Sequence, residues 1–230
     1  MLPVACAGCG AVDVAWCAAC RSALAGPPWR CEQRAGRLDL LDGRPPLPVW
    51  TLADNVGAVR HAIVAWKDGG RLDLTRPLAA DVARAARSVA PHVPRSRPGP
   101  LVVAAVPSTA GARRRRGGWL VDELARAAVA ALREEGVDVR RAPVLRRRGG
   151  RDQAGLGARA RARNLVGQLR VARGADRVLG GRDVVLVDDV LTTGASVAAS
   201  AAAVRAAGGV VVACLTVAST PGPGTGGVAR

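Results

Sequence analysis

Short apolar runs alternate with stretches of helical periodicity along most of this chain. The apolar runs that predict strands occupy residues 101–106, 137–144, 169–171, 183–189 and 210–217. Apolar positions that recur every three or four residues predict helices over 52–66, 74–89, 119–134 and 196–207. Strands that alternate with helices favour an α/β fold, with a parallel sheet and right-handed crossovers.

Changes in composition divide the chain into four segments. Residues 1–25 hold a cysteine module, and 26–48 are a Gly-, Pro- and Arg-rich linker for which we expect little structure. Residues 49–218 form the α/β domain, and 219–230 are a Gly-, Pro- and Thr-rich tail that we expect to be disordered. No apolar run is long enough to span a membrane and no secretion signal opens the chain, so we expect a cytoplasmic protein without a membrane partner.

The run at 183–189 ends in two adjacent acids, and a polar turn follows it. Asp188 and Asp189 come at the end of a strand that should be buried on both faces, where open α/β sheets place their ligands. The turn that follows offers hydroxyls and backbone N–H groups at a helix N-terminus, and it consists of Thr192, Thr193, Gly194, Ala195 and Ser196. Carboxylates beside phosphate donors predict a sugar phosphate ligand. The alternative is an ordinary helix cap, which does not need two neighbouring acids.

A second polar turn follows the strand at 101–106. It contains Val106, Pro107, Ser108 and Thr109. It is thus the second of two strand ends that carry polar turns. By itself it also fits a plain strand-to-helix turn.

Four cysteines lie close together near the start of the chain. Cys6 and Cys9 form one Cys-x-x-Cys pair, and Cys17 and Cys20 form another. In a reducing compartment this spacing favours one tetrahedral structural zinc over disulfides. A redox-active pair is the alternative, and Cys31 is an alternative fourth ligand; Cys214 lies in an apolar run and reads as a core thiol.

The formal charge of +16 suggests a nucleic-acid partner. However, nearly all 34 basic residues are arginine, Ala, Gly and Val abound, and Tyr and Phe are absent. This skew favours a compositional drift of the whole chain over a dedicated nucleic-acid surface. Residue types that the drift has nearly removed are of interest where they remain: Lys67 is the sole lysine, and Asn55 and Asn164 are the sole asparagines.

The acidic turn resembles the 5-phosphoribosyl-1-pyrophosphate (PRPP) fingerprint of type I phosphoribosyltransferases: four apolar residues, two acids, two or three further residues, then Thr-Gly. The resemblance implies that Asp188 and Asp189 are catalytic residues that hold the ribose hydroxyls, and that the turn from Thr192 to Ser196 binds the 5′-phosphate. It also implies that the turn from Val106 to Thr109 binds the pyrophosphate.

The order of motifs along nearly the whole chain resembles the ComF family of competence-associated, phosphoribosyltransferase-like proteins. Lys67 matches that family's Leu-Lys-aromatic-x-Gly region, although Asp68 replaces the aromatic residue. Arg115 and Arg116 match its Arg-Arg-Gly, after which this chain has Gly-Trp-Leu where Phe-Asn-Gln is common. The match to its Gln…Arg-x-x-Asn loop, a candidate lid, consists of Gln153, Arg161, Arg163 and Asn164.

The resemblance implies a type I phosphoribosyltransferase-like sheet with a zinc-ribbon-like module. Its implied activity is transfer of phosphoribosyl from PRPP and Mg to a nitrogenous base, with Lys67, Arg115 and Arg116 on the pyrophosphate. The alternative is a non-catalytic DNA-uptake accessory that binds single-stranded DNA or a competence helicase; the lack of aromatic stacking residues counts against it. No general base stands out, because His61 and His92 read as surface or helix residues. The acceptor base is not determined, and the sequence leaves a homodimer open.

Overall fold

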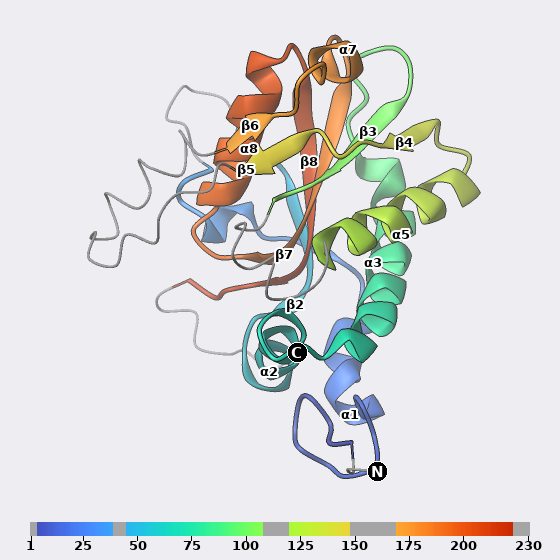
Figure 1. Cartoon of the computed structure of the whole chain (residues 1–230), viewed down its shortest axis with the longest axis vertical. Helices are drawn as coiled ribbons and strands as arrows, with labels where there is room; N and C mark the ends of the chain where they lie inside the picture. The colour runs from blue at the N-terminus through green and yellow to red at the C-terminus, as the bar shows by residue number, and fades with distance from the viewer. Residues whose placement is uncertain (1–3, 39–44, 108–119, 148–168, 223–230) are drawn as a thin grey trace.

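The computed structural model describes residues 4–38, 45–107, 120–147 and 169–222, and its centre is a six-stranded sheet with the order β1-β2-β8-β7-β3-β4 (Figure 1). All neighbouring pairs are parallel except β1 with β2. The strands of this sheet are β1 (Trp29–Arg30), β2 (Val49–Asp54), β3 (Leu101–Ala105), β4 (Val139–Arg141), β7 (Asp183–Leu191) and β8 (Val210–Ser219). A separate antiparallel pair joins β5 (Leu145–Arg147) to β6 (Leu169–Val171).

Helices cover both faces of the central sheet. The helices are α1 (Ala18–Arg21), α2 (Gly57–Lys67), α3 (Thr75–Val89), α5 (Leu120–Glu134), α7 (Asp176–Leu179) and α8 (Ala195–Ala206). Single 3₁₀ turns are η1 (Ser22–Leu24), η2 (Glu32–Arg34), η3 (Leu72–Leu74) and η4 (Ala90–His92). α3 and α5 pack together on one face, and α8 lies on the other with the β5–β6 pair beside it (Figure 1).

The sheet separates two apolar cores, which explains why β7 is apolar without interruption from Val184 to Val187. Val185 and Val187 belong to the core under α3 and α5, whereas Val184 and Leu186 belong to the core under α8. Successive side chains of a strand point to opposite faces, so a strand covered on both sides needs an apolar residue at every position. The predicted α/β sheet with mostly parallel strands is confirmed.

The connections reverse direction between β3 and β7. From β3 the chain passes through α5 to β4 on one side, and from β7 it passes through α8 to β8 on the other. Right-handed crossovers that run in opposite directions place α5 and α8 on opposite faces. The crevice beyond the carboxyl ends of β3 and β7 is therefore the topological switch point, where open α/β sheets bind their ligands.

The helix predicted over 52–66 is wrong in its first part. Val49–Asp54 is a buried parallel strand beside β8, and the helix begins only at Gly57. The apolar residue Leu52 fits either periodicity, and pairing with β8 selects the strand. The helices predicted over 74–89, 119–134 and 196–207 are confirmed within a residue or so by α3, α5 and α8.

The expectation of an unstructured linker over 26–48 is wrong for the part that the structure describes. β1 pairs with β2, and Cys31, Ala35 and Leu38 are buried in the core under α8. The guanidinium of Arg30 stacks over Trp50, which adds to the attachment of this segment. Apolar residues spaced three or four apart among glycines and arginines are what dock it.

Several boundaries also differ from those predicted. β7 continues past the acids to Leu191, and β8 continues to the buried Ser219, so the tail begins later than 219. The strand predicted over 137–144 is β4 alone, and Arg146 lies in the next strand, β5. α7 was not predicted. The tail residues 223–230 lie outside the described residues.

Polar contacts attach the cysteine module to the α/β domain. Arg71 donates to the carbonyl oxygens of Ala5 (2.8 Å) and Ala15 (3.1 Å). Arg21 holds the carboxylate of Asp81 in a two-bond contact (3.0 and 3.1 Å). The module lies at one end of the molecule, next to α2 (Figure 1). None of the helices in the described ranges is long and apolar enough to cross a membrane.

Candidate functional site

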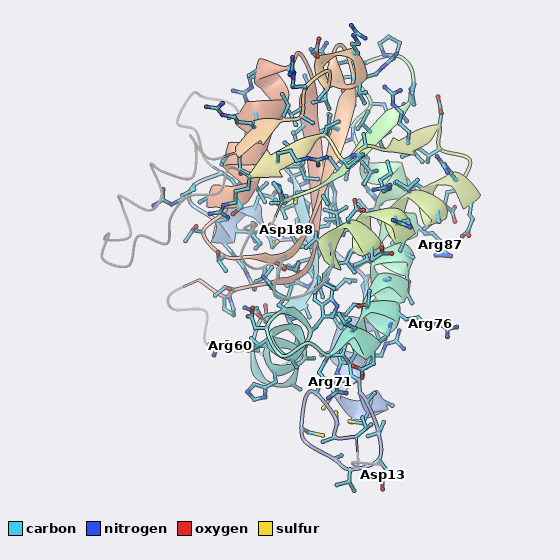
Figure 2. All side chains as sticks on the ribbon, viewed as in Figure 1. Asp13, Arg60, Arg71, Arg76, Arg87 and Asp188 are labelled. Carbon is cyan, nitrogen blue, oxygen red and sulfur yellow. The ribbon has the colours of Figure 1, made fainter. Side chains whose placement is uncertain are left out.

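Asp188 and Asp189 lie near the carboxyl end of β7 and are almost fully buried, with 9% and 5% of their surface exposed. Figure 2 shows Asp188 in the interior, whereas Arg60 and Arg76 lie at the periphery. The backbone N–H of Asp189 donates to Asp188 Oδ1 (2.9 Å), and that of Val190 donates to Asp189 Oδ1 (2.7 Å). Both carboxylates are thus oriented by the strand's own backbone at the switch point.

The ammonium of Lys67 contacts the second acid directly. Its Nζ lies 2.6 Å from Asp189 Oδ2, and the two side chains are 27% and 7% exposed. Lys67 is the last residue of α2, so this ion pair joins that helix to the central strand. The sequence indicated both residues but not the contact between them.

Burial raises the pKa of Asp188 well above its usual range, and the negative charge of Asp189 raises it further. The positive charge of Lys67 opposes this shift. Acids with shifted pKa values cluster at binding and catalytic sites, where burial and neighbouring charges are arranged to shift them.

The turn after β7 packs tightly against the segment after β1. Gly194 has a φ of +79°, and a Cβ atom there would come within 2.8 Å of Leu38 Cγ and 3.0 Å of Ala35 Cβ. The backbone N–H of Arg37 also donates to the Thr193 carbonyl oxygen (3.3 Å). Only glycine meets both demands, so the turn shape and the N-terminal segment determine each other.

The same turn presents its donors outward. Thr192 and Thr193 are exposed, and Ala195 and Ser196 are half-buried at the first turn of α8. The twelve-residue α8 places the positive end of its dipole here. Hydroxyls and N–H groups at such a helix start can bind a phosphate.

The end of β3 lies beside the acids. Val106 and Pro107 are buried, and the Val106 N–H donates to the carbonyl oxygen of Val187 (2.9 Å), the residue before Asp188. The structure therefore brings together the acids, the turn after them, Lys67 and the start of the second polar turn. The other predicted site residues lie outside the described residues: Ser108, Thr109, Arg115, Arg116, Gln153, Arg161, Arg163 and Asn164.

Sequence reasoning missed the residues of the 31–38 segment that contact the turn. Ala35, Arg37 and Leu38 support Thr193 and Gly194 from a region that we expected to be a linker. The apolar spacing of Cys31, Ala35 and Leu38 was the available signal. His61 and His92 are exposed on α2 and η4, as predicted.

The four N-terminal cysteines form a cluster that fits a zinc ion. Their sulfur atoms all lie within 4.8 Å of one another, and Cys9 Sγ is 3.8 Å from Cys17 Sγ. Four sulfurs at 2.3 Å from a tetrahedral zinc would be about 3.8 Å apart. A Cβ atom at Gly8 would come 2.8 Å from Cys20 Sγ, so glycine is what allows this turn to approach the cluster.

The surroundings of Cys6 also suit a metal ligand. Burial alone would raise the pKa of its thiol, but N–H groups of Cys17, Cys9 and Gly8 lower it to about 6. Thiolate is the form that binds metal. Cys31 is wrong as an alternative ligand, because it is fully buried in the core under α8, whereas the cluster consists of the other four; Cys214 is a core thiol, as predicted.

Among known proteins, the chain is similar to solved structures only at the level of the fold. No protein-family model and no curated protein matches it. Adenine phosphoribosyltransferase from Thermoanaerobacter pseudethanolicus is 18% identical over 71% of this chain and 75% of its own, with a TM-score of 0.33. Hypoxanthine phosphoribosyltransferase from Staphylococcus aureus is 10% identical over 63% and 64%, with a TM-score of 0.35.

The hypoxanthine phosphoribosyltransferase from Trypanosoma cruzi is 20% identical over 62% of this chain and 64% of its own, with a TM-score of 0.33. Scores at this level assign no ligand to this chain. The chain has a mixed α/β fold with a mostly parallel central sheet and a four-cysteine cluster, and the three similar structures named above are phosphoribosyltransferases.

Proposed function

We propose that this chain is a phosphoribosyltransferase-like protein of the ComF type. It binds PRPP with magnesium and transfers the phosphoribosyl group to a nitrogenous base, releasing pyrophosphate. The observation that carries the proposal is the pair of buried acids on the central strand, at the switch point and next to a helix-start turn. The fingerprint in the sequence supports the same ligand.

The ribose would lie over the acids. Asp188 and Asp189 would accept hydrogen bonds from its 2- and 3-hydroxyls, and the turn from Thr192 to Ser196 would bind its 5-phosphate. When the bond from C1 to pyrophosphate breaks, positive charge develops on the ribose. Oriented carboxylates in a site with little water stabilise that charge more strongly than they would in water.

The leaving diphosphate would lie on the side of Val106 and Pro107, the start of the second polar turn. Lys67 is a cation at the same edge of the sheet. Arg115 and Arg116 are further candidates from the sequence.

The carboxylates also suit magnesium, which prefers oxygen ligands and is commonly held by one or two carboxylates together with substrate phosphates. Asp188 and Asp189 would supply the protein oxygens. When bound, the ion would neutralise part of the charge on the diphosphate.

Calorimetry with PRPP and MgCl₂ tests the proposal. We expect saturable binding that Asp189→Asn weakens at least about tenfold, because an amide offers one acceptor oxygen and no charge. Asp81→Asn is the matched control: Asp81 is also a buried acid paired with a basic residue, but it lies under the cysteine module.

The control variant should bind PRPP like the unaltered chain, even if it is less stable. No binding by the unaltered chain, or equal binding by Asp189→Asn, would overturn the proposal. A screen of nucleobases for pyrophosphate release then identifies the acceptor.

A further inference from the structure

The ion pair between Lys67 and Asp189 occupies an oxygen that a ribose would need. Asp189 Oδ1 already accepts the N–H of Val190 at 2.7 Å, and Oδ2 is 2.6 Å from Lys67 Nζ. A sugar hydroxyl that approaches this carboxylate therefore competes with an ammonium group. The competition matters because the carboxylate side chain is only 7% exposed and leaves little room for both.

Displacing Lys67 without giving it a new partner is unfavourable. Its side chain is 27% exposed, so most of it is already removed from water. A cation that loses its counter-ion in such a place keeps the cost of desolvation and loses the attraction that offset it. A second anion within reach of the flexible lysine side chain removes that difficulty.

The chemistry of the sugar determines where such an anion can be. In a 5-phosphorylated ribose the 2-hydroxyl is attached to the carbon next to C1. An ammonium that moves off the carboxylate holding the hydroxyls is therefore adjacent to the substituent on C1. When that substituent is diphosphate, Lys67 gains a new ionic partner; when it is a hydroxyl, it gains none.

We propose that Lys67 makes binding of the ribose by Asp189 conditional on an anionic group at C1, so that it is a specificity-determining residue. This inference rests on the proposed function and deepens it. Ribose 5-phosphate binds through the turn after β7 and leaves the ion pair in place. PRPP exchanges the Asp189 carboxylate for its own diphosphate as the partner of Lys67.

Three variants and two ligands test the exchange by calorimetry in MgCl₂. Lys67→Met removes the ammonium and should lower the ratio of PRPP affinity to ribose 5-phosphate affinity by about tenfold or more. Lys67→Arg keeps a cation and should restore most of the ratio. Arg60→Met removes a positive charge from an exposed position of the same helix and should leave the ratio unchanged (Figure 2).

The unaltered chain allows a second measurement, because Lys67 is its sole lysine. Lysine labelled with ¹³C at Cε therefore gives a single side-chain signal in NMR spectra. We expect PRPP with MgCl₂ to shift that signal, and ribose 5-phosphate to leave it where it is. This readout does not depend on whether Lys67→Met folds.

The outcomes separate the two proposals. If the unaltered chain binds neither ligand, the proposed function is wrong. If it binds PRPP but Lys67→Met keeps the same affinity ratio, the exchange is wrong while the proposed function stands. The exchange is likewise overturned if both ligands shift the lysine signal equally.

Discussion

Asp188 and Asp189 are neighbours in the sequence but lie in different electrostatic surroundings. Both are buried, but Asp189 contacts the ammonium of Lys67, whereas Asp188 lies close to the negative charge of Asp189. Burial raises the pKa of Asp188, and the charge of Asp189 raises it further. We therefore expect Asp188 to make the stability of the fold depend on pH.

At pH values between the ordinary aspartate pKa and the raised pKa of Asp188, the folded chain keeps a proton that the unfolded chain has released. The free energy of unfolding should fall as the pH rises above the ordinary aspartate pKa of about 3.9. Asp188→Asn keeps an oxygen for the Asp189 N–H but cannot ionise. We expect this variant to melt at a higher temperature than the unaltered chain at pH 7, by about 2–4 °C for each kcal/mol of relief.

The difference in melting temperature should shrink near pH 4, because Asp188 of the unaltered chain is then protonated and, like the asparagine, carries no charge. Thermal melts of both chains from pH 4 to pH 8 measure it. A constant difference across that range would mean that Asp188 is not the group responsible.

At the scale of elements, the turn between β7 and α8 depends on a segment far away in the sequence. Gly194→Ala should destabilise the fold for two reasons: its φ of +79° is unfavourable for alanine, and its Cβ would contact Leu38 and Ala35. Gly136→Ala is the matched control, because its φ is +75° and a Cβ there meets open space.

Chemical denaturation should show that Gly194→Ala loses about 1–3 kcal/mol more than Gly136→Ala, the range typical of overpacking. The same variant should weaken PRPP binding, because the turn must move to make room. Equal losses in both variants would show that the 31–38 segment yields easily and does not shape the turn.

The sequence predicted the elements whose periodicity is unambiguous. The long helices α3 and α5 and the apolar strands β3 and β7 are examples, because each has one pattern over many residues. β2 was missed, since Val49–Asp54 runs without a break into the stripe of α2 and only its pairing with β8 reveals a strand.

The site was predictable as residue types but not as contacts. Adjacent acids before a Thr-Gly turn place carboxylates beside phosphate donors in the sequence itself, so Asp188, Asp189 and Gly194 could be identified from it. The pairing of Lys67 with Asp189 and the support of Gly194 by Leu38 join segments that are distant in sequence. Such contacts depend on packing, which no local pattern expresses.

At the scale of the whole molecule, the cysteine module should depend on metal. Apart from cysteines, Trp16 and Leu24 are the buried apolar residues in the described part of this segment, and metal binding supplies about 10–16 kcal/mol to isolated zinc modules. We expect about one zinc per chain by elemental analysis, and a lower melting temperature after chelation. Cys9→Ser should lose the zinc, whereas Cys31→Ala should keep it.

Protein without metal, whose four N-terminal thiols all react freely in native buffer, would contradict the zinc assignment. The interpretation of the chain as a DNA-uptake accessory also belongs to this scale and stays a prediction. Its signature would be a DNA affinity that falls steeply with salt.

Both edge strands of the central sheet are short. β1 has two residues and lies on the outer side of β2, and β4, at the opposite edge, has three residues. A long unpaired edge strand can pair with strands of other molecules and cause aggregation, and short edge strands are one way in which proteins avoid this. The segment after the cysteine module thus also covers the edge of β2. Proteolytic loss of roughly the first thirty-eight residues would expose β2 as an aggregation-prone edge strand and would remove the support of the turn after β7.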